Sequence, residues 1–369
     1  AHFASINNVH ERFAAGAFAP AILNISFILS LFVLTPLLPS AGHALSYGVL
    51  VGGVLQFLYL YWTVLKFYRP RIRIPVLNDK LKKFFLLFLP GVVGSGVIQL
   101  NIVIGTIIAS FLPVGAISHI YYADRLNQLP LAIFGIALGI VLLPNLSKAI
   151  KQSDQETTHN IQNRSIEFSL LIALPSAIGL FILAEPIIYI LFERGAFLQE
   201  DTFYTARVLG YFALGLPAYI IIKVLVSCFF AREDTKTPLY ISLVSVISNI
   251  VLSLLLIGSM REMGIALATA ISAWINALLL YLLLFTRGFL KFDSLLIRNS
   301  IKILLSSALL IFGIFGLKGI LFDDFSANSI LINSLSLFLM IFLVLIIYLG
   351  LVIVLKVLTI NKLKQYLKK

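Results

Sequence analysis

Long runs of apolar residues, each separated from the next by a short polar connection, dominate the 369-residue sequence. A helix needs about 20 predominantly apolar residues to cross roughly 30 Å of hydrocarbon. The longest polar connection, at 66–83, is too short to hold a soluble domain. The pattern predicts an all-α polytopic membrane protein with about ten transmembrane helices, at residues 19–38, 43–65, 84–112, 117–146, 167–192, 204–230, 238–258, 262–286, 299–321 and 330–358.

The composition agrees with this prediction and excludes several classes of site. Hydrophobic residues make up 60% of the chain and charged residues 12%, which is about half the average for soluble proteins. Cys228 is the only cysteine, so the chain forms no internal disulfide and no site with several cysteine ligands. The sequence shows no HExxH spacing, no Ser/His/Asp arrangement and no phosphate-binding glycine loop. We expect neither an enzyme nor a cofactor.

Basic residues gather in every second connection. Residues 66–83 carry seven Lys and Arg against one acid, and the tail at 356–369 carries five Lys and no acid. The connections at 36–43 and 112–117 carry no Lys or Arg. Because Lys and Arg are enriched on the cytoplasmic side, both termini are predicted to be cytoplasmic. The net charge of +12 then favours contact with anionic phospholipids and not with nucleic acid.

The basic connection also divides the chain. We expect two helices in residues 1–65, a basic cytoplasmic linker at 66–83 and six helices in 84–286. Residues 287–369 then hold two peripheral, almost wholly apolar helices and the basic tail. Since the sequence opens on Ala1 without the features of a signal peptide, we also expect the chain to be part of a longer protein.

One predicted span carries charge at membrane depth. Asp124 and Arg125 lie in 117–146, where an ionised side chain costs about 2.5–3.5 kcal/mol on insertion scales. Arg125 lies roughly 10 Å inside the span, too deep to reach bulk water without a cavity. The guanidinium suits phosphate or carboxylate, so we predict an anion-binding cavity; a structural Asp124–Arg125 pair, or an Arg125 bond to another helix, is the alternative. Helical spacing places a polar stripe on this span: Ser118, Tyr121, Tyr122, Arg125 and Gln128.

A second cation, Lys223, lies eight residues before the cytoplasmic end of 204–230. It is a further candidate for the cavity, although a lysine at this depth also reaches the interface by extending its side chain. Beyond it, Asp234 or Thr235 is expected to cap the helix that begins near Pro238. Arg232, Asp234, Lys236 and Pro238 therefore have a structural interpretation, with a role in gating as the alternative.

Three amides, Asn101, Asn249 and Asn276, lie inside predicted spans. Hydrogen bonds between helices explain such residues most simply. A cation site at Asn249 is the alternative interpretation.

Four stretches of the sequence carry a family resemblance. They are ERFAAGAFAPAILNIS (11–26), VGGVLQ (51–56), YYADRLNQLPLAIFGIALGIVLLPNLSK (121–148) and KVLVSCFFAREDTKTP (223–238). They resemble the MurJ/MviN family of lipid II flippases, in the multidrug/oligosaccharidyl-lipid/polysaccharide exporter superfamily. The resemblance implies a carrier fold with fourteen helices in two lobes around a cationic cavity. This chain would supply the fifth to the fourteenth helix, so its N-terminal lobe would be incomplete.

The resemblance also implies a function. The family moves lipid II, a lipid-linked peptidoglycan precursor, from the inner to the outer leaflet of the bacterial cytoplasmic membrane by alternating access. Arg125 matches a cavity arginine expected to attract the pyrophosphate, and the last two helices would form a groove for the lipid tail. Partners would be lipid II, anionic phospholipids and cell-wall synthesis enzymes.

Two other functions stay open at this point. One is another carrier of the superfamily, either a flippase for a different lipid-linked oligosaccharide or a drug/cation antiporter. An antiporter would be expected to show acidic residues in its spans, and only Asp124, Glu167 and Glu185 approach this. The other is a truncated, nonfunctional remnant that serves as a scaffold.

Overall fold

The computed structural model describes residues 2–10, 12–65, 101–321 and 329–357, with isolated positions between 66 and 100. Regular structure in this part of the chain is entirely helical, as predicted. Residues 101–109 are helical. The elements with defined bounds are α1 (His2–Val9), α2 (Phe13–Leu34), the 3₁₀ turn η1 (Thr35–Leu37), α3 (Ala41–Val64), α5 (Ala116–Lys151), α6 (Gln155–Ile182), α7 (Ala184–Phe192), α8 (Gln199–Phe230), α9 (Lys236–Met260), α10 (Glu262–Thr286), α11 (Ser294–Leu321) and α12 (Ile330–Val354).

Within these residues, eight helices are long and apolar enough to cross a membrane. They overlap eight of the ten predicted spans, which confirms a polytopic all-α fold. Helix α5, 36 residues long, covers the predicted span 117–146 without being one of the eight. The predicted span 84–112 lies partly outside the described residues.

The prediction of one continuous span at 167–192 is wrong in its boundaries. Helix α6 begins at Gln155, where the Asp154 side chain accepts a hydrogen bond from the Thr157 backbone N–H at 2.9 Å. It ends at Ile182, and α7 begins at Ala184. Pro186 has no N–H for the Ile182 carbonyl, so one helix cannot continue through it unbroken, whereas the first turn of a new helix accepts a proline.

The chain divides into two compact units, Ala1–Phe85 and Leu86–Lys369. In the first unit α2 packs along α3 through small residues four apart. A Cβ atom on Gly48 would lie 2.4 Å from the Ser30 hydroxyl, and one on Gly52 would lie 2.6 Å from the Leu23 side chain. These glycines let the two helices approach closely, as in many membrane helix pairs.

Most of the predicted linker at 66–83 and the tail from residue 358 onward lie outside the described residues. The finer division into 1–65, 84–286 and 287–369 therefore stays a prediction.

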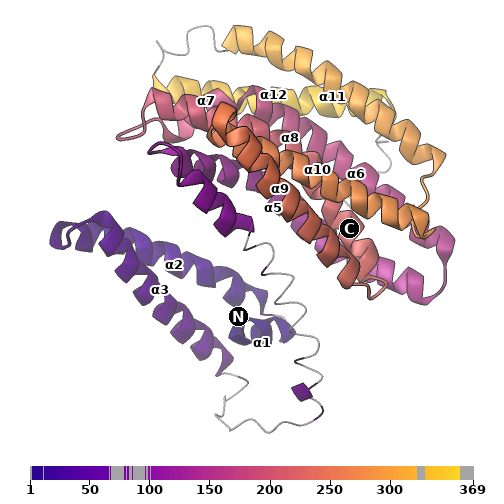
Figure 1. Ribbon diagram of the computed structural model, residues 1–369, viewed down its shortest axis with the longest axis horizontal. Coiled ribbons are helices and arrows are strands. Elements are labelled where there is room, and N and C mark those ends of the chain that lie inside the picture. Colours follow the sequence, from indigo (N-terminus) through magenta and orange to yellow (C-terminus); the bar gives the residue numbers. More distant parts are fainter. Residues whose placement is uncertain are drawn as a thin grey trace. The chain divides into compact units, whose positions relative to one another are not determined.

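Helix α8 is the centre of the second unit. It contacts α5, α6, α7, α9 and α10, while α11 packs on α6 and α12 packs on α11 and α7 (Figure 1). In its most apolar stretch 61% of the residues are buried, against 17% in α9. Its buried face alternates small residues such as Ala213 and Gly215 with Phe212 and Leu216, so neighbouring helices come close on several sides.

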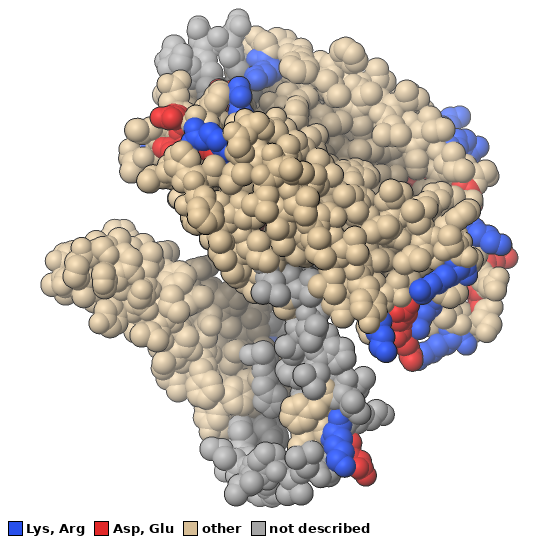
Figure 2. All heavy atoms as spheres, in the orientation of Figure 1, with Lys and Arg blue, Asp and Glu red and all other residues tan. Residues whose placement is uncertain are grey.

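Charged side chains of this unit gather at the two ends of the helices. Figure 2 shows them at both ends, with a broad uncharged band between them on the visible face. Large apolar side chains such as Leu255, Phe312 and Phe338 are exposed on α9, α11 and α12. An apolar band between two charged rims is the surface expected of a protein that spans a bilayer.

The connection between α8 and α9 is held by charged groups. The Asp234 carboxylate accepts hydrogen bonds from the Thr237 N–H at 2.9 Å and from its hydroxyl at 2.7 Å. Thr235 makes no side-chain cap, so Asp234 caps α9, with Pro238 in the first turn. Arg287, beyond the end of α10, pairs with Asp234 at 2.8 Å. Arg232 donates to the backbone oxygens of Cys228 and Phe289.

Helices α9 and α10 form a tight hairpin around a single residue, Arg261, whose φ is +52°. Gly264 makes this hairpin possible. A Cβ atom there would lie 2.8 Å from the backbone oxygen of Leu256. Because the obstacle is backbone, it cannot rotate away as a flexible side chain could.

We expect Asp234→Ala to destabilise the second unit by about 1–2 kcal/mol through loss of the cap. Burial alone would raise the pKa of Asp234, but the hydrogen bonds from Thr237 and the pair with Arg287 outweigh it and lower that pKa. A lowered pKa means that this stabilisation is present above the ordinary aspartate value of about 3.9. It is lost as pH falls through the lower value of the folded state. Thermal unfolding in detergent across acidic pH tests both points, and equal acid sensitivity of wild type and variant would contradict them.

Gly264→Ala should destabilise the α9–α10 hairpin by about 1–3 kcal/mol, because the added methyl group overlaps the Leu256 carbonyl. Gly258→Ala is the matched control, since a Cβ there meets no atom within 4 Å. The control should be neutral or slightly stabilising, because alanine is the better helix former. Melting midpoints of both variants in the same detergent provide the measurement. Equal midpoints would show that the hairpin accommodates the methyl group.

Candidate functional site

A polar cavity of about 380 Å³ lies among α5, α8 and α10. Helix α8 packs against both of the other two helices. Three residues predicted to bind substrate line the cavity, namely Asp124, Gln128 and Lys223. The complete lining is Asp124, Asn127, Gln128, Leu131 and Ala132 from α5, Phe212, Tyr219 and Lys223 from α8, and Thr269 from α10.

The α5 wall supplies a carboxylate and two amides. Asp124, Asn127 and Gln128 are three and four residues apart, so they share one face of the helix. The Gln128 amide donates a hydrogen bond to the Asp124 carboxylate. Asn127 is buried, and its Oδ1 atom has no hydrogen-bond partner among the described residues. A buried acceptor without a partner costs about 1–3 kcal/mol, so the α5 wall holds a hydrogen-bonding capacity that the described structure leaves unused.

The α8 wall supplies a phenol and a cation. Tyr219 and Lys223 are four residues apart, on one face. The Tyr219 hydroxyl is buried and, in the described structure, also lacks a hydrogen-bond partner. A Cβ atom on Gly215 would lie 2.7 Å from that hydroxyl, so the glycine makes room for the ring. Lys223 is exposed in the cavity and forms no ion pair with any described residue.

The α10 wall joins the cavity to the intramembrane amides. Thr269 donates a hydrogen bond to the Ile265 backbone oxygen at 2.8 Å, and its hydroxyl lies 3.4 Å from Asn249 Oδ1. Asn249 donates to Asn101 Oδ1 at 2.9 Å and accepts from Ser253. These contacts are neutral hydrogen bonds between helices. The cation site at Asn249 stays a prediction; among the described residues no cluster of His, Cys, Asp and Glu could hold a metal ion.

Four members of the predicted stripe lie outside the lining, namely Ser118, Tyr121, Tyr122 and Arg125. Arg125 is exposed, and its guanidinium lies 4.7 Å from the centre of the Tyr121 ring. Tyr122 packs against the rings of Phe192 and Phe197, at 4.7 and 5.5 Å. Consecutive residues are about 100° apart around a helix, so Asp124 and Arg125 cannot point to the same centre. In the described structure no ion pair joins them.

Sequence reasoning missed Asn127, Tyr219 and Thr269 as cavity residues. The spacing along the chain could have identified the first two, because residues three or four apart share one face of a helix. Asn127 is three residues after Asp124, and Tyr219 is four residues before Lys223. No spacing in the sequence could have identified Thr269, since α10 reaches the cavity only through its tertiary packing on α8.

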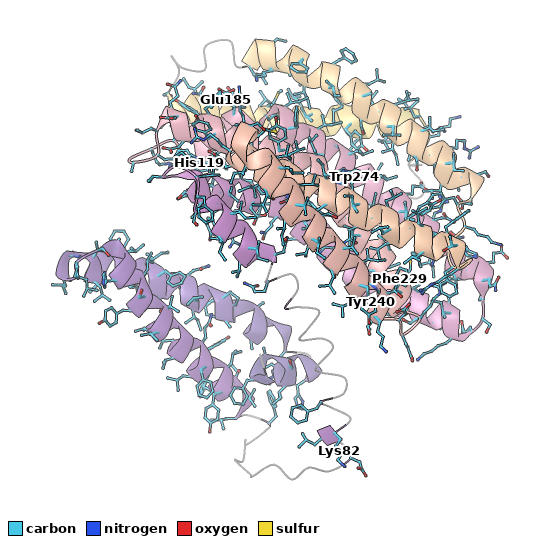
Figure 3. All side chains as sticks on the ribbon, viewed as in Figure 1. Lys82, His119, Glu185, Phe229, Tyr240 and Trp274 are labelled. Carbon is cyan, nitrogen blue, oxygen red and sulfur yellow. The ribbon has the colours of Figure 1, made fainter. Side chains whose placement is uncertain are left out.

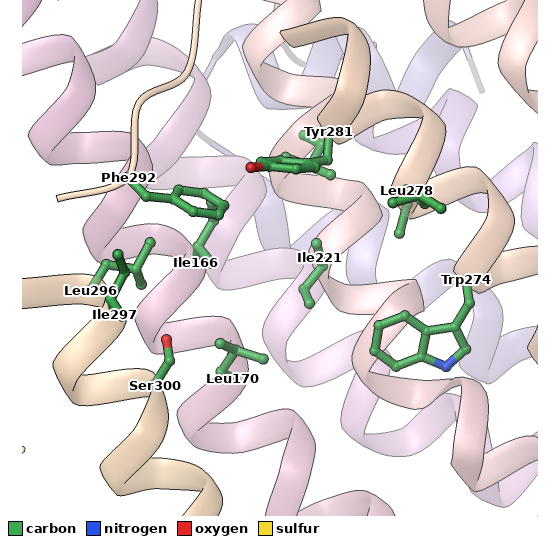
Figure 4. A pocket seen from close by; sticks show the side chains of 12 residues that line it. Ile166, Leu170, Ile221, Trp274, Leu278, Tyr281, Phe292, Leu296, Ile297 and Ser300 are labelled. Atoms are coloured by element: carbon green, nitrogen blue, oxygen red, sulfur yellow. The ribbon is translucent and has the colours of Figure 1, made fainter. Parts of the chain in front are cut away.

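A second pocket, of about 350 Å³, is apolar. Figure 4 shows Tyr281 beside Phe292 near one end and Trp274 farther along α10. The rings of Tyr281 and Phe292 are stacked, with their centres 5.0 Å apart. Its walls come from α6, α8, α10 and α11 and the residues before α11, so it lies between α10 and α11. The groove predicted between the last two helices is a different place and stays a prediction.

Comparison with known proteins identifies the family of this chain. The sequence matches the family described as lipid II flippase MurJ over residues 1–340. A probable lipid II flippase MurJ of Rhizobium tropici is 42% identical over 311 residues, which are 83% of this chain and 58% of that protein. A solved structure of lipid II flippase MurJ in an inward closed conformation has 28% identity and a TM-score of 0.76, covering 95% of this chain and 69% of that one. An inward-facing multidrug resistance MATE family transporter, with a TM-score of 0.65 and 13% identity, shares the fold alone.

The chain spans a little more than half the length of the curated relatives it matches. Within that length, both the sequence match and the helical architecture extend over nearly all of the chain. The chain therefore belongs to the MurJ family of lipid II flippases, which are multi-pass membrane proteins and not enzymes.

Proposed function

We propose that the protein moves lipid II from the inner to the outer leaflet of the bacterial cytoplasmic membrane. The observation that carries this proposal is the cavity among α5, α8 and α10, whose wall holds a carboxylate, two amides, a phenol and a lysine within an otherwise apolar helical unit. Polar groups at membrane depth are costly, and they mark the path of a polar substrate. Membership of the MurJ family supports lipid II as that substrate.

The groups in the cavity suit the two chemical parts of such a headgroup. Pyrophosphate needs cationic partners, and Lys223 stands in the cavity without an ion pair to any described residue. Arg125, on the next face of α5, is exposed and able to meet an anion beside the cavity. Asn127, Gln128 and Tyr219 offer amide and phenol groups to sugar hydroxyls and peptide bonds.

The lipid tail requires only an apolar surface. We propose that it stays in the membrane while the headgroup crosses, along the apolar faces of α11 and α12. Exposed side chains such as Phe312, Phe315 and Phe338 make these faces compatible with hydrocarbon. The apolar pocket between α10 and α11 offers a second surface of the same kind.

Alternating access is the mechanism that we propose for this movement, with the binding site opening to one side of the membrane and then to the other. The basic connections support an orientation with both termini in the cytoplasm, where Lys and Arg contact anionic phospholipids. A membrane potential supplies about 2.3 kcal/mol per charge per 100 mV, so an anionic headgroup is sensitive to it. Cell-wall synthesis enzymes, which use the product, are the proposed partners.

Lys223→Gln should reduce flipping by about tenfold or more, because a charge-assisted hydrogen bond contributes roughly 1.5–3 kcal/mol. Lys223→Arg should retain part of the activity, since it keeps the charge. The measurement is growth of a flippase-depleted bacterium that expresses the gene encoding this chain, with the amount of protein in the membrane determined in parallel. Lys151→Gln, at the end of α5, is the matched control and should grow normally.

Arg125→Ala should abolish rescue in the same cells without lowering the amount of protein in the membrane. Arg125→Lys should restore part of it. Normal growth on the alanine variant would remove Arg125 from the substrate path. Failure of the unmutated protein to rescue growth would instead point to another lipid-linked substrate or to a chain that no longer transports.

A further inference from the structure

The three helices that line the polar cavity meet in a charged cluster near their N-terminal ends. His119 is the fourth residue of α5, Asp201 lies in the first turn of α8 and Glu262 is the first residue of α10. His119 Nε2 lies 2.9 Å from Asp201 Oδ1, and its Nδ1 lies 3.0 Å from Glu262 Oε1. Figure 3 labels His119 at the start of α5.

Burial makes the charge state of this cluster important. His119 is 4% exposed and Glu262 is fully buried. A neutral imidazole carries one N–H, so its other nitrogen would direct a lone pair at a carboxylate. An imidazolium donates to both carboxylates at once. We propose that His119, Asp201 and Glu262 form a proton-binding site, in which the proton on His119 joins α5, α8 and α10 at one end of the cavity.

The surrounding groups balance the charge of this site. Arg261 Nε lies 3.5 Å from Glu262 Oε2, and Arg261 donates a hydrogen bond to the Tyr204 hydroxyl at 2.9 Å. The Tyr204 ring stacks on His119, with ring centres 5.7 Å apart. The titratable or charged groups that face His119 are thus Asp201 and Tyr204 from α8, Glu262 from α10 and Arg261 from the α9–α10 turn. With His119 protonated, the positive charges of His119 and Arg261 balance the negative charges of Asp201 and Glu262.

The backbone around the site is held tightly. Arg261 has a φ of +52°, in a region that residues other than glycine seldom adopt, and its side chain is anchored on Tyr204. A Cβ atom on Gly115, which precedes α5, would lie 3.3 Å from the His119 ring. Both features fix the ends of α5 and α10 against the imidazole.

Loss of the proton would leave two carboxylates facing an uncharged ring in a buried place. The cluster would then carry a net negative charge, and solvation would favour separation of the helix ends. His119 is five residues from Asp124 on α5, about 8 Å along the helix. The N-terminal ends of α5, α8 and α10 are therefore held together at this end of the cavity while His119 is protonated. They can separate when His119 loses its proton. This inference does not depend on the identity of the cargo.

Nitrogen NMR of histidine-labelled protein in detergent micelles at neutral pH tests the charge state directly. We expect both ring nitrogens of His119 to carry a proton, and the His119→Lys variant assigns the signal by its absence. His159, whose ring contacts the Gln162 amide, is the internal control. A single protonated nitrogen on His119 would overturn the proposal.

Charge variants separate this site from an ordinary hydrogen bond. His119→Gln should lower the melting midpoint by about 5 °C or more, because it leaves the buried Glu262 carboxylate and the partly exposed Asp201 carboxylate without a cation between them. His119→Lys should retain most of the stability, and adding Glu262→Gln to His119→Gln should recover part of the loss. Since lysine stays charged to a higher pH than histidine, wild type should lose stability on going to alkaline pH while His119→Lys keeps it. If His119→Gln and His119→Lys have the same melting midpoint, the proton on His119 does not hold the helices together. The same conclusion follows if alkaline pH lowers the melting midpoints of wild type and His119→Lys equally.

Discussion

The cost of an unpartnered polar group in hydrocarbon is the constraint on which the rest of this structure depends. The backbone in the bilayer avoids this cost by forming helices, in which the N–H and C=O groups are hydrogen-bonded to each other. Side chains meet it by finding partners within the bundle, as Asn249 does with Asn101, Ser253 and Thr269. The cavity among α5, α8 and α10 departs from this rule, because the Asn127 oxygen and the Tyr219 hydroxyl are buried in its wall without a partner among the described residues.

Close helix packing gives this cavity its shape. Helix α8 is buried on most sides, and its small residues let α5, α6 and α10 approach it. Gly215 leaves room for the Tyr219 ring in the cavity wall, and Gly264 lets α10 turn back on α9. At one end, His119 joins the same three helices through its hydrogen bonds with Asp201 and Glu262. The cavity and this cluster therefore share one set of helices, α5, α8 and α10.

The charged network at the α8–α9 connection illustrates the difference between the two ends of a membrane helix and its middle. Asp234 is reached by Thr237, two residues into α9, and by Arg287 from beyond α10, so a single carboxylate caps one helix and ties it to another. Arg232 is held by two backbone oxygens of its surroundings. Asp234 and Arg232 lie in the connection between α8 and α9, at the helix ends, where charge costs less than within a membrane helix, whereas Asp124 and Lys223 lie within α5 and α8 and line the cavity.

The sequence by itself determined the class of the protein, because a run of about 20 apolar residues has few outcomes other than a membrane helix. It also pointed to Asp124, Gln128 and Lys223, since charge and amide groups inside such a run require a reason. Where α6 ends and α7 begins depended on Pro186, a local signal that the hydrophobic pattern conceals. Only the tertiary structure decided that Arg125 lies outside the lining, that Thr269 lies within it and that His119 meets two distant carboxylates. Periodicity defines the face of one helix, but which faces of different helices meet is decided by packing between residues far apart in the chain.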